Sequence, residues 1–137
     1  MSVDKIWSLR RGKSPLMATA IHDGHDVREE VGHLLALSDE ERLREEDPFT
    51  GSWTHLTDTR VKGLRSRFEV DLNRPRERAV YMTKEDSWGL KTWRHPPPEE
   101  LVDRSLAEYD AFYADMRRLM SDLVGRHGKF VVFDLHS

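Results

Sequence analysis

The sequence contains no cysteine, which excludes disulfide bonds and thiolate metal ligands. It also lacks an apolar run long enough to span a bilayer, and residues 1–11 lack the apolar core of a signal peptide. No block of lysine and arginine stands apart from acidic residues, and the net charge of -3 gives no reason to expect nucleic-acid binding. We therefore expect a cytoplasmic protein that binds neither nucleic acid nor a membrane.

The length of 137 residues fits a single domain with one hydrophobic core. Close to its end, the sequence has a nearly continuous apolar run from Phe130 to Leu135, followed by His136 and Ser137. This run predicts a strand buried on both faces. Chains rarely end on a buried strand, because termini usually lie at the surface. We therefore expect residues 1–137 to be the N-terminal part of a larger domain that continues past Ser137.

Two segments near the N-terminus also predict strands. Ile6 to Arg10 predicts a short edge strand, and Leu16 to Ile21 is small and apolar, which predicts a buried one. The second strand is followed at once by a polar cluster that begins with His22 and holds Gly24. A polar cluster after a buried strand is the usual place for a functional site in α/β proteins.

The stretch from Arg65 to Pro75 combines a strand pattern with a polar turn. Val61 to Leu72 predicts a strand or a bent pair of strands, in which apolar and polar residues alternate. The expected inner face holds Phe68, Val70 and Leu72, and the outer face holds Glu69, Asp71 and Asn73. Pro75 ends the strand and holds Arg74 in extended backbone, where its guanidinium can grip both oxygens of a carboxylate.

The longest predicted helix covers Pro98 to Val124 and ends at Gly125 or Gly128. Its apolar stripe recurs at steps of three and four residues: Val102, Leu106, Tyr109, Tyr113, Met116, Met120 and Leu123. Shorter helices are predicted for Val27–Leu37 and from Ser38 to about Glu46, the second with a capping box. The segments Asp47–Asp58 and Arg76–Pro98 are predicted to be loops.

These elements together predict a three-layer α/β fold. The sheet is expected to be mixed and mostly parallel, with helices on its faces and with Leu16–Ile21 and Phe130–Leu135 as interior strands. The long helix is expected to cover one face of this sheet.

The positions of the histidines point to a metal site. His22 and His136 both follow buried strands, and neutral imidazole is a common zinc ligand. A catalytic zinc needs a third protein ligand, which an acid or His25 can supply. Asp47 follows a predicted helix end and is held by Pro48, which makes it one such acid.

The order of these motifs resembles the N-formylglutamate amidohydrolase family. The resemblance runs from about Pro15 to Ser137, and the segment Ser66 to Pro75 is its most specific part. Three further motifs carry it: Ile21-His22-x-Gly24, Glu46-Asp47 and Asp134-x-His136-Ser137. The family is similar in turn to the zinc carboxypeptidases and the aspartoacylases, so the resemblance implies a zinc-carboxypeptidase-like fold.

The resemblance also implies roles for particular residues. His22, Asp47 and His136 match the metal ligands, with Zn²⁺ or another divalent metal as cofactor. His25 or Glu46 is the alternative third ligand, because the carboxypeptidase pattern has Glu where this sequence has His25. Asn73 and Arg74 match a clamp for the substrate carboxylate, and Arg67 matches a further substrate arginine. The family's catalytic acid or base is expected beyond Ser137.

Two functions follow from these expectations. The first is a zinc-dependent amidohydrolase of amino-acid degradation, acting on a small N-acyl amino acid such as N-formylglutamate. The second is an inactive or truncated domain that still binds a carboxylate and a metal. A carboxypeptidase is disfavoured, because the His-x-x-Glu pair of that family is absent from the sequence.

Overall fold

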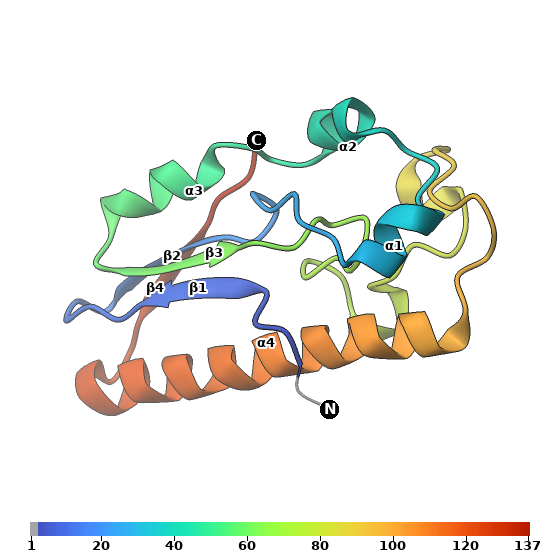
Figure 1. Cartoon of the computed structure of the whole chain (residues 1–137). Coiled ribbons are helices and arrows are strands. Elements are labelled where there is room, and N and C mark those ends of the chain that lie inside the picture. Colours follow the sequence, from blue (N-terminus) through green and yellow to red (C-terminus); the bar gives the residue numbers. More distant parts are fainter. Residues whose placement is uncertain (1–2) are drawn as a thin grey trace.

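A mixed four-stranded sheet lies between a long helix on one side and short helical segments on the other, in the left half of the view (Figure 1). The computed structural model describes residues 3–137. The strand order is β1-β3-β2-β4. The strands are β1 (Trp7–Arg10), β2 (Leu16–Ala20), β3 (Thr59–Gly63) and β4 (Val131–Asp134). Only β1 and β3 pair antiparallel, which confirms a mixed, mostly parallel sheet.

Helix α4 (Glu99–His127) runs the length of the sheet along one face (Figure 1). Pro98 lies at its N-cap, and two acidic residues occupy the first turn, where they complement the helix dipole. The helix ends at Gly128, whose φ of 77° is the left-handed conformation that glycine adopts without strain. Of the two predicted ends, Gly128 is therefore the observed one.

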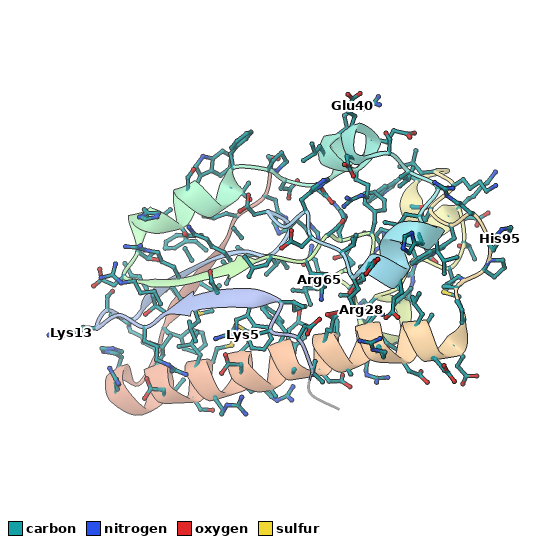
Figure 2. The ribbon with its side chains drawn as sticks, in the orientation of Figure 1. Lys5, Lys13, Arg28, Glu40, Arg65 and His95 are labelled. Carbon is teal, nitrogen blue, oxygen red and sulfur yellow. The ribbon has the colours of Figure 1, made fainter. Side chains whose placement is uncertain are left out.

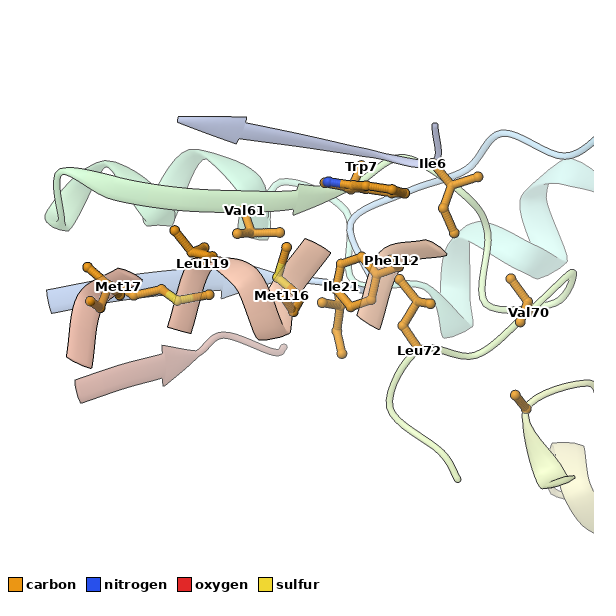
Figure 3. Packing of buried hydrophobic residues seen from close by; sticks show 12 residues of the cluster. Ile6, Trp7, Met17, Ile21, Val61, Val70, Leu72, Phe112, Met116 and Leu119 are labelled. Carbon is orange, nitrogen blue, oxygen red and sulfur yellow. The ribbon is translucent and has the colours of Figure 1, made fainter. Parts of the chain in front are cut away.

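The face that α4 buries is displaced from the predicted stripe. Its most buried residues are Leu101, Ser105, Glu108, Phe112, Met116, Leu119 and Leu123. Phe112, Met116 and Leu119 pack against side chains of the sheet and its flanking loops (Figure 3). Ser105 and Glu108 interrupt the apolar pattern, so a stripe traced through apolar residues alone passes beside the true centre of the face.

The two strands that were predicted to be interior have different environments. Strand β2 lies between β3 and β4 and is buried from Met17 onward, as predicted. The prediction for Phe130–Leu135 is wrong, because β4 is an edge strand within the described residues. The side chains of Val131 and Phe133 are 49% and 41% exposed. Helix α4 covers one face of β4. On the opposite face of the sheet, helix α3 (Thr50–Trp53) and the 3₁₀ turn η1 (Thr54–Leu56) contact β2 and β3.

The prediction of an alternating strand through Leu72 is also wrong. Strand β3 stops at Gly63, and the chain from Ser66 folds into turns in which the Ser66 carbonyl accepts from Glu69 N at 3.1 Å. Residues of both predicted faces are buried: Phe68, Glu69, Val70, Asp71 and Leu72. The acids enter the interior because each has cationic or hydrogen-bonding partners there.

Two arginines and two glutamates form a buried ionic cluster that holds this segment against α4. Arg28 Nη1 lies 2.9 Å from Glu69 Oε2 and 2.8 Å from Glu108 Oε1. Arg65 Nε lies 2.9 Å from Glu69 Oε2, and the Arg65 guanidinium also pairs with Glu108. Figure 2 shows Arg28 and Arg65 beside each other above α4.

The ionic cluster predicts an unusual pH dependence. Burial, with the neighbouring Glu108 carboxylate, raises the pKa of Glu69 from 4.5 to about 8. The folded state therefore holds a proton that the unfolded chain releases, so this contribution is complete below about pH 4.5 and is lost by about pH 8. Between those limits we expect the free energy of unfolding to fall by up to about 1 kcal/mol per pH unit.

Urea unfolding of the parent and of Glu69→Gln at several pH values measures this effect. The glutamine keeps the shape of the neutral acid but cannot titrate, so the stability of the parent should fall relative to the variant as pH rises. A constant difference between the two proteins from pH 5 to 8 would contradict the raised pKa.

The remaining elements are short. Helix α1 (Glu29–Leu34) and helix α2 (Asp39–Glu45) lie within their predicted ranges, and the Ser38–Glu41 capping box is confirmed. The predicted loop at Asp47–Asp58 instead contains α3 (Thr50–Trp53) and η1 (Thr54–Leu56). Residues 76–98 hold only two 3₁₀ turns, η2 (Arg76–Arg78) and η3 (Glu85–Ser87). No helix of residues 3–137 is long and apolar enough to cross a membrane.

Candidate active site

His22 follows β2 and is held between two aspartates. The backbone N–H of Asp47 donates to the His22 carbonyl at 2.8 Å, which fixes the two residues side by side. The imidazole presents Nε2 to Asp71 Oδ1 at 2.6 Å and Nδ1 toward Asp47 Oδ2 at 3.7 Å. Gly24 permits this arrangement, since a Cβ there would collide with the backbone of Leu64 and Arg65.

His136 approaches the same aspartate from the end of β4. Its Nδ1 lies 3.0 Å from Asp47 Oδ2, and its Nε2 lies 3.0 Å from Asp134 Oδ2. The His22 and His136 ring centroids are 5.1 Å apart. One ligand atom from each of His22, Asp47 and His136 lies within 4.8 Å of the others. These three side chains could therefore hold one metal ion.

The pKa of His136 reflects its position between two acids, Asp47 and Asp134. Burial alone would lower its pKa, but hydrogen bonds that the imidazole donates to Asp134 and Asp47 outweigh burial and raise the pKa above the ordinary value of 6.5. Imidazole must be unprotonated to bind a metal, so protons and a cation compete for this group.

The two alternative ligands, His25 and Glu46, lie in a separate group. His25 Nδ1 is 2.6 Å from Glu46 Oε1, and the other oxygen of Glu46 accepts from Ser66 Oγ and from Arg42 Nη1. Glu46 is therefore committed to tying α2 to the Ser66 turn. Neither residue belongs to the group formed by His22, Asp47 and His136.

Asp71 links His22 to a set of aromatic and cationic side chains. Its Oδ2 accepts from the Tyr81 hydroxyl and from Arg67 Nη2, the latter at 3.3 Å. Burial alone would raise the pKa of Asp71, but the hydrogen bonds and charges of His22, Tyr81 and Arg67 outweigh it and hold the pKa well below 3.8. Asp71 therefore remains an anion that orients the His22 ring.

The two predicted substrate arginines both converge on Asp71 but differ in their free donors. Arg67 also donates from Nε to the Tyr81 hydroxyl and from Nη1 to the Glu45 carbonyl. Arg74 donates from Nη2 to the Asp86 carbonyl at 2.6 Å. Its Nη1 is buried and has no hydrogen-bond partner among the described residues, although the Asp86 carboxylate lies 3.9 Å away, beyond hydrogen-bond distance. Arg74 is thus the arginine with a donor to spare for a ligand.

A comparison with protein-family models decides the family. The model described as N-formylglutamate amidohydrolase matches residues 14–137, which is most of the chain. The chain belongs to the N-formylglutamate amidohydrolase family. Comparisons with curated proteins and with solved structures gave no match. Membership identifies the chain with a family of hydrolases, as the motif order from Ile21 to Ser137 predicts.

In this family member, one predicted site residue, Asn73, has an unexpected position. Asn73 is solvent-exposed, and its backbone N–H donates to Asp71 Oδ1 at 2.8 Å. It therefore contributes to the orientation of Asp71 through its main chain. Its role toward a substrate carboxylate stays a prediction.

Three residues around this family site were missed by sequence reasoning: Asp71, Tyr81 and Trp88. Asp71 lies within the most specific motif, but it alternates with apolar residues, and this pattern predicted a solvent-exposed side chain. Tyr81 and Trp88 lie in the irregular segment, where no periodicity indicates which side chains point inward. The length of that segment was the available signal that it serves a function.

Proposed function

We propose that this protein is a metal-dependent amidohydrolase that cleaves a small N-acyl amino acid such as N-formylglutamate. The observation that carries the proposal is the convergence of two chemically different groups. His22, Asp47 and His136 supply the ligands for a cation, and Asp71 joins His22 to the arginine that has a free donor. Membership of the N-formylglutamate amidohydrolase family supports the reaction class.

The donor set fits a divalent metal such as Zn²⁺. Two imidazoles and one carboxylate are typical of catalytic zinc, which keeps a further position open. Each histidine bonds through its Nε2 to a second carboxylate, Asp71 or Asp134, and such bonds fix the orientation of metal-binding imidazoles. When bound, the metal supplies a Lewis acid that polarises the scissile carbonyl and activates water.

The arginine would position the substrate for this chemistry. Arg74 Nη1 offers a donor to the substrate carboxylate, and Asp71, which is hydrogen-bonded to His22, lies 3.7 Å from Arg74 Nε. A carboxylate bound at Arg74 would hold the amide at a fixed place relative to His22, which turns binding energy into orientation. Arg67, each of whose three nitrogens already donates to the protein, would neutralise Asp71 and keep its carboxylate in place.

Removal of the metal is the direct test of this proposal. N-formyl-L-glutamate should be hydrolysed by the zinc-loaded natural protein, and chelation should abolish turnover until Zn²⁺ is restored. His22→Ala should lose activity as completely as chelation does, while His33→Ala, a change of an exposed histidine on α1, serves as the matched control. Hydrolysis that persists after the metal is removed would overturn the proposal.

A second candidate is a domain that binds the carboxylate and metal without hydrolysis. It is favoured by the engagement of the nearby acids, because Glu46, Asp71 and Asp134 each bond to a histidine. Calorimetry with N-formyl-L-glutamate and Zn²⁺ on the 137-residue chain separates the two. Binding of both without release of formate supports this second candidate.

A further inference from the structure

Trp88 stands in a backbone conformation that bulky residues rarely adopt. Its φ of 55° is left-handed, and it directly follows η3. The turn around it is tied down, since the Asp86 carboxylate accepts from the backbone of Met82 and Thr83 at 3.0 and 3.2 Å. A strained residue persists only where the surrounding structure imposes it, and such residues concentrate at functional sites.

The Trp88 indole lies close to both of the arginines that were predicted to bind substrate, Arg67 and Arg74. Its ring centroid lies 4.7 Å from the Arg67 guanidinium carbon and 5.8 Å from that of Arg74. It also meets Tyr81 edge to face at 6.0 Å. These contacts fix the ring, yet the residue remains 55% exposed. The exposed part of the Trp88 indole is thus a large apolar surface beside the guanidinium groups of Arg67 and Arg74.

The unpartnered donor of Arg74 lies in the same group of side chains. Arg74 packs over the Tyr81 ring at 4.5 Å and lies near Trp88. Its Nη1 is buried without a hydrogen-bond partner in residues 3–137, because the Asp86 carboxylate lies 3.9 Å away, beyond hydrogen-bond distance. A buried donor without a partner is costly, so it indicates a place for an acceptor. The acceptor that suits a guanidinium is a carboxylate, and the surface beside it is aromatic.

We propose that Trp88 is a specificity-determining residue that selects carboxylates bearing an aliphatic chain. The carboxylate accepts from Arg74 Nη1, and the methylene groups next to it pack against the exposed indole. This inference rests on the role that the proposed function gives to Arg74. It adds the class of ligand that the site prefers: organic carboxylates with an apolar stem, over small anions of equal charge.

The experiment compares formate with butyrate, which have the same charge but differ in apolar surface. Both are titrated in the presence of a chelator, and affinities are read from the ligand signals by NMR. The proteins are the parent, Trp88→Gly, Trp88→Phe and Trp53→Ala. Glycine adopts a left-handed φ without strain, so Trp88→Gly should fold although the indole is gone. Trp53 is a control tryptophan on α3 that is 49% exposed.

We expect the parent to bind butyrate about tenfold more tightly than formate, because part of three additional carbon groups leaves water. Trp88→Gly should lose this preference, Trp88→Phe should keep most of it, and Trp53→Ala should match the parent. Circular dichroism confirms that each variant is folded. A purely structural role for Trp88 would weaken both ligands equally and leave their ratio unchanged.

An unchanged preference in Trp88→Gly would overturn the inference, and so would a parent that binds neither carboxylate. Neither ligand has an amide bond and no metal is present, so the result does not depend on catalysis. A parent that prefers butyrate through Trp88 but fails to hydrolyse N-formyl-L-glutamate supports this inference while it refutes the hydrolase.

Discussion

Replacing Arg74 with alanine is expected to reduce kcat/KM for N-formyl-L-glutamate by roughly thirtyfold to several thousandfold, equivalent to about 2–5 kcal/mol. The reason is that the substrate carboxylate would lose its charged partner in a largely buried setting. Only 19% of the Arg74 side chain is exposed, and the rings of Tyr81 and Trp88 cover it. A lost interaction is worth most where water cannot replace it.

The lysine variant tests the geometry of this interaction. Arg74→Lys keeps the charge but removes the planar fork, in which one nitrogen donates to the Asp86 carbonyl and another has no hydrogen-bond partner within residues 3–137. Lysine should therefore recover little activity. Arg76→Ala is the matched control, because Arg76 is exposed and pairs with Asp110 on the surface. Equal kcat/KM for Arg74→Ala and the parent would remove Arg74 from the site.

The second large effect is expected on stability. Glu108→Ala should lower the free energy of unfolding by about 3–5 kcal/mol, because the change leaves buried arginine charge unpaired. Glu108 is 2% exposed and pairs with both Arg28 and Arg65. In its absence the pKa of Glu69 should fall, since Glu108 is one cause of its raised value, and ionised Glu69 would offset part of the loss.

Urea unfolding at pH 7 measures this change. Glu108→Gln should cost less than Glu108→Ala, since the amide oxygen still accepts hydrogen bonds from the guanidinium groups. Glu100→Ala, an exposed change in the first turn of the same helix, should cost well under 1 kcal/mol. If Glu108→Ala proved as mild as Glu100→Ala, the ionic cluster would not be a significant source of stability.

The parts of the fold that the sequence predicted correctly are those with strong local signals. Pro98 and Gly128 mark α4, the Ser38–Glu41 capping box marks α2, and the small apolar run after Leu16 marks β2. Each signal acts within a few residues of the element that it defines, so no knowledge of distant contacts is needed. The convergence of His22 with His136 followed from one further rule, that polar residues after parallel strands meet at one edge.

The errors arose where distant partners decide the structure. The alternation of apolar and polar residues predicted that Glu69 and Asp71 are exposed to solvent. Both are buried, because Glu69 pairs with Arg28 and Asp71 with His22, each partner about forty or more positions earlier in the chain. Likewise, an apolar run does not indicate whether one or both faces of β4 are covered. The choice between Asp47, His25 and Glu46 as third metal ligand also depended on such a contact, because His25 and Glu46 are hydrogen-bonded to each other. The zinc-carboxypeptidase-like fold and the place of residues 1–137 in a larger domain stay predictions.

The pairing of β2 with β4 has a consequence for the order in which the molecule assembles. Thr19 and Asp134 are hydrogen-bonded across this pair although 115 positions separate them in the chain. Contacts between such distant segments slow folding, because a long loop must close before they contribute any stability. During synthesis, the β4 side of β2 stays unpaired until residues 131–134 have left the ribosome. His136 can reach Asp47 only after that, so the group of His22, Asp47 and His136 forms later than the elements that precede β4 in the chain.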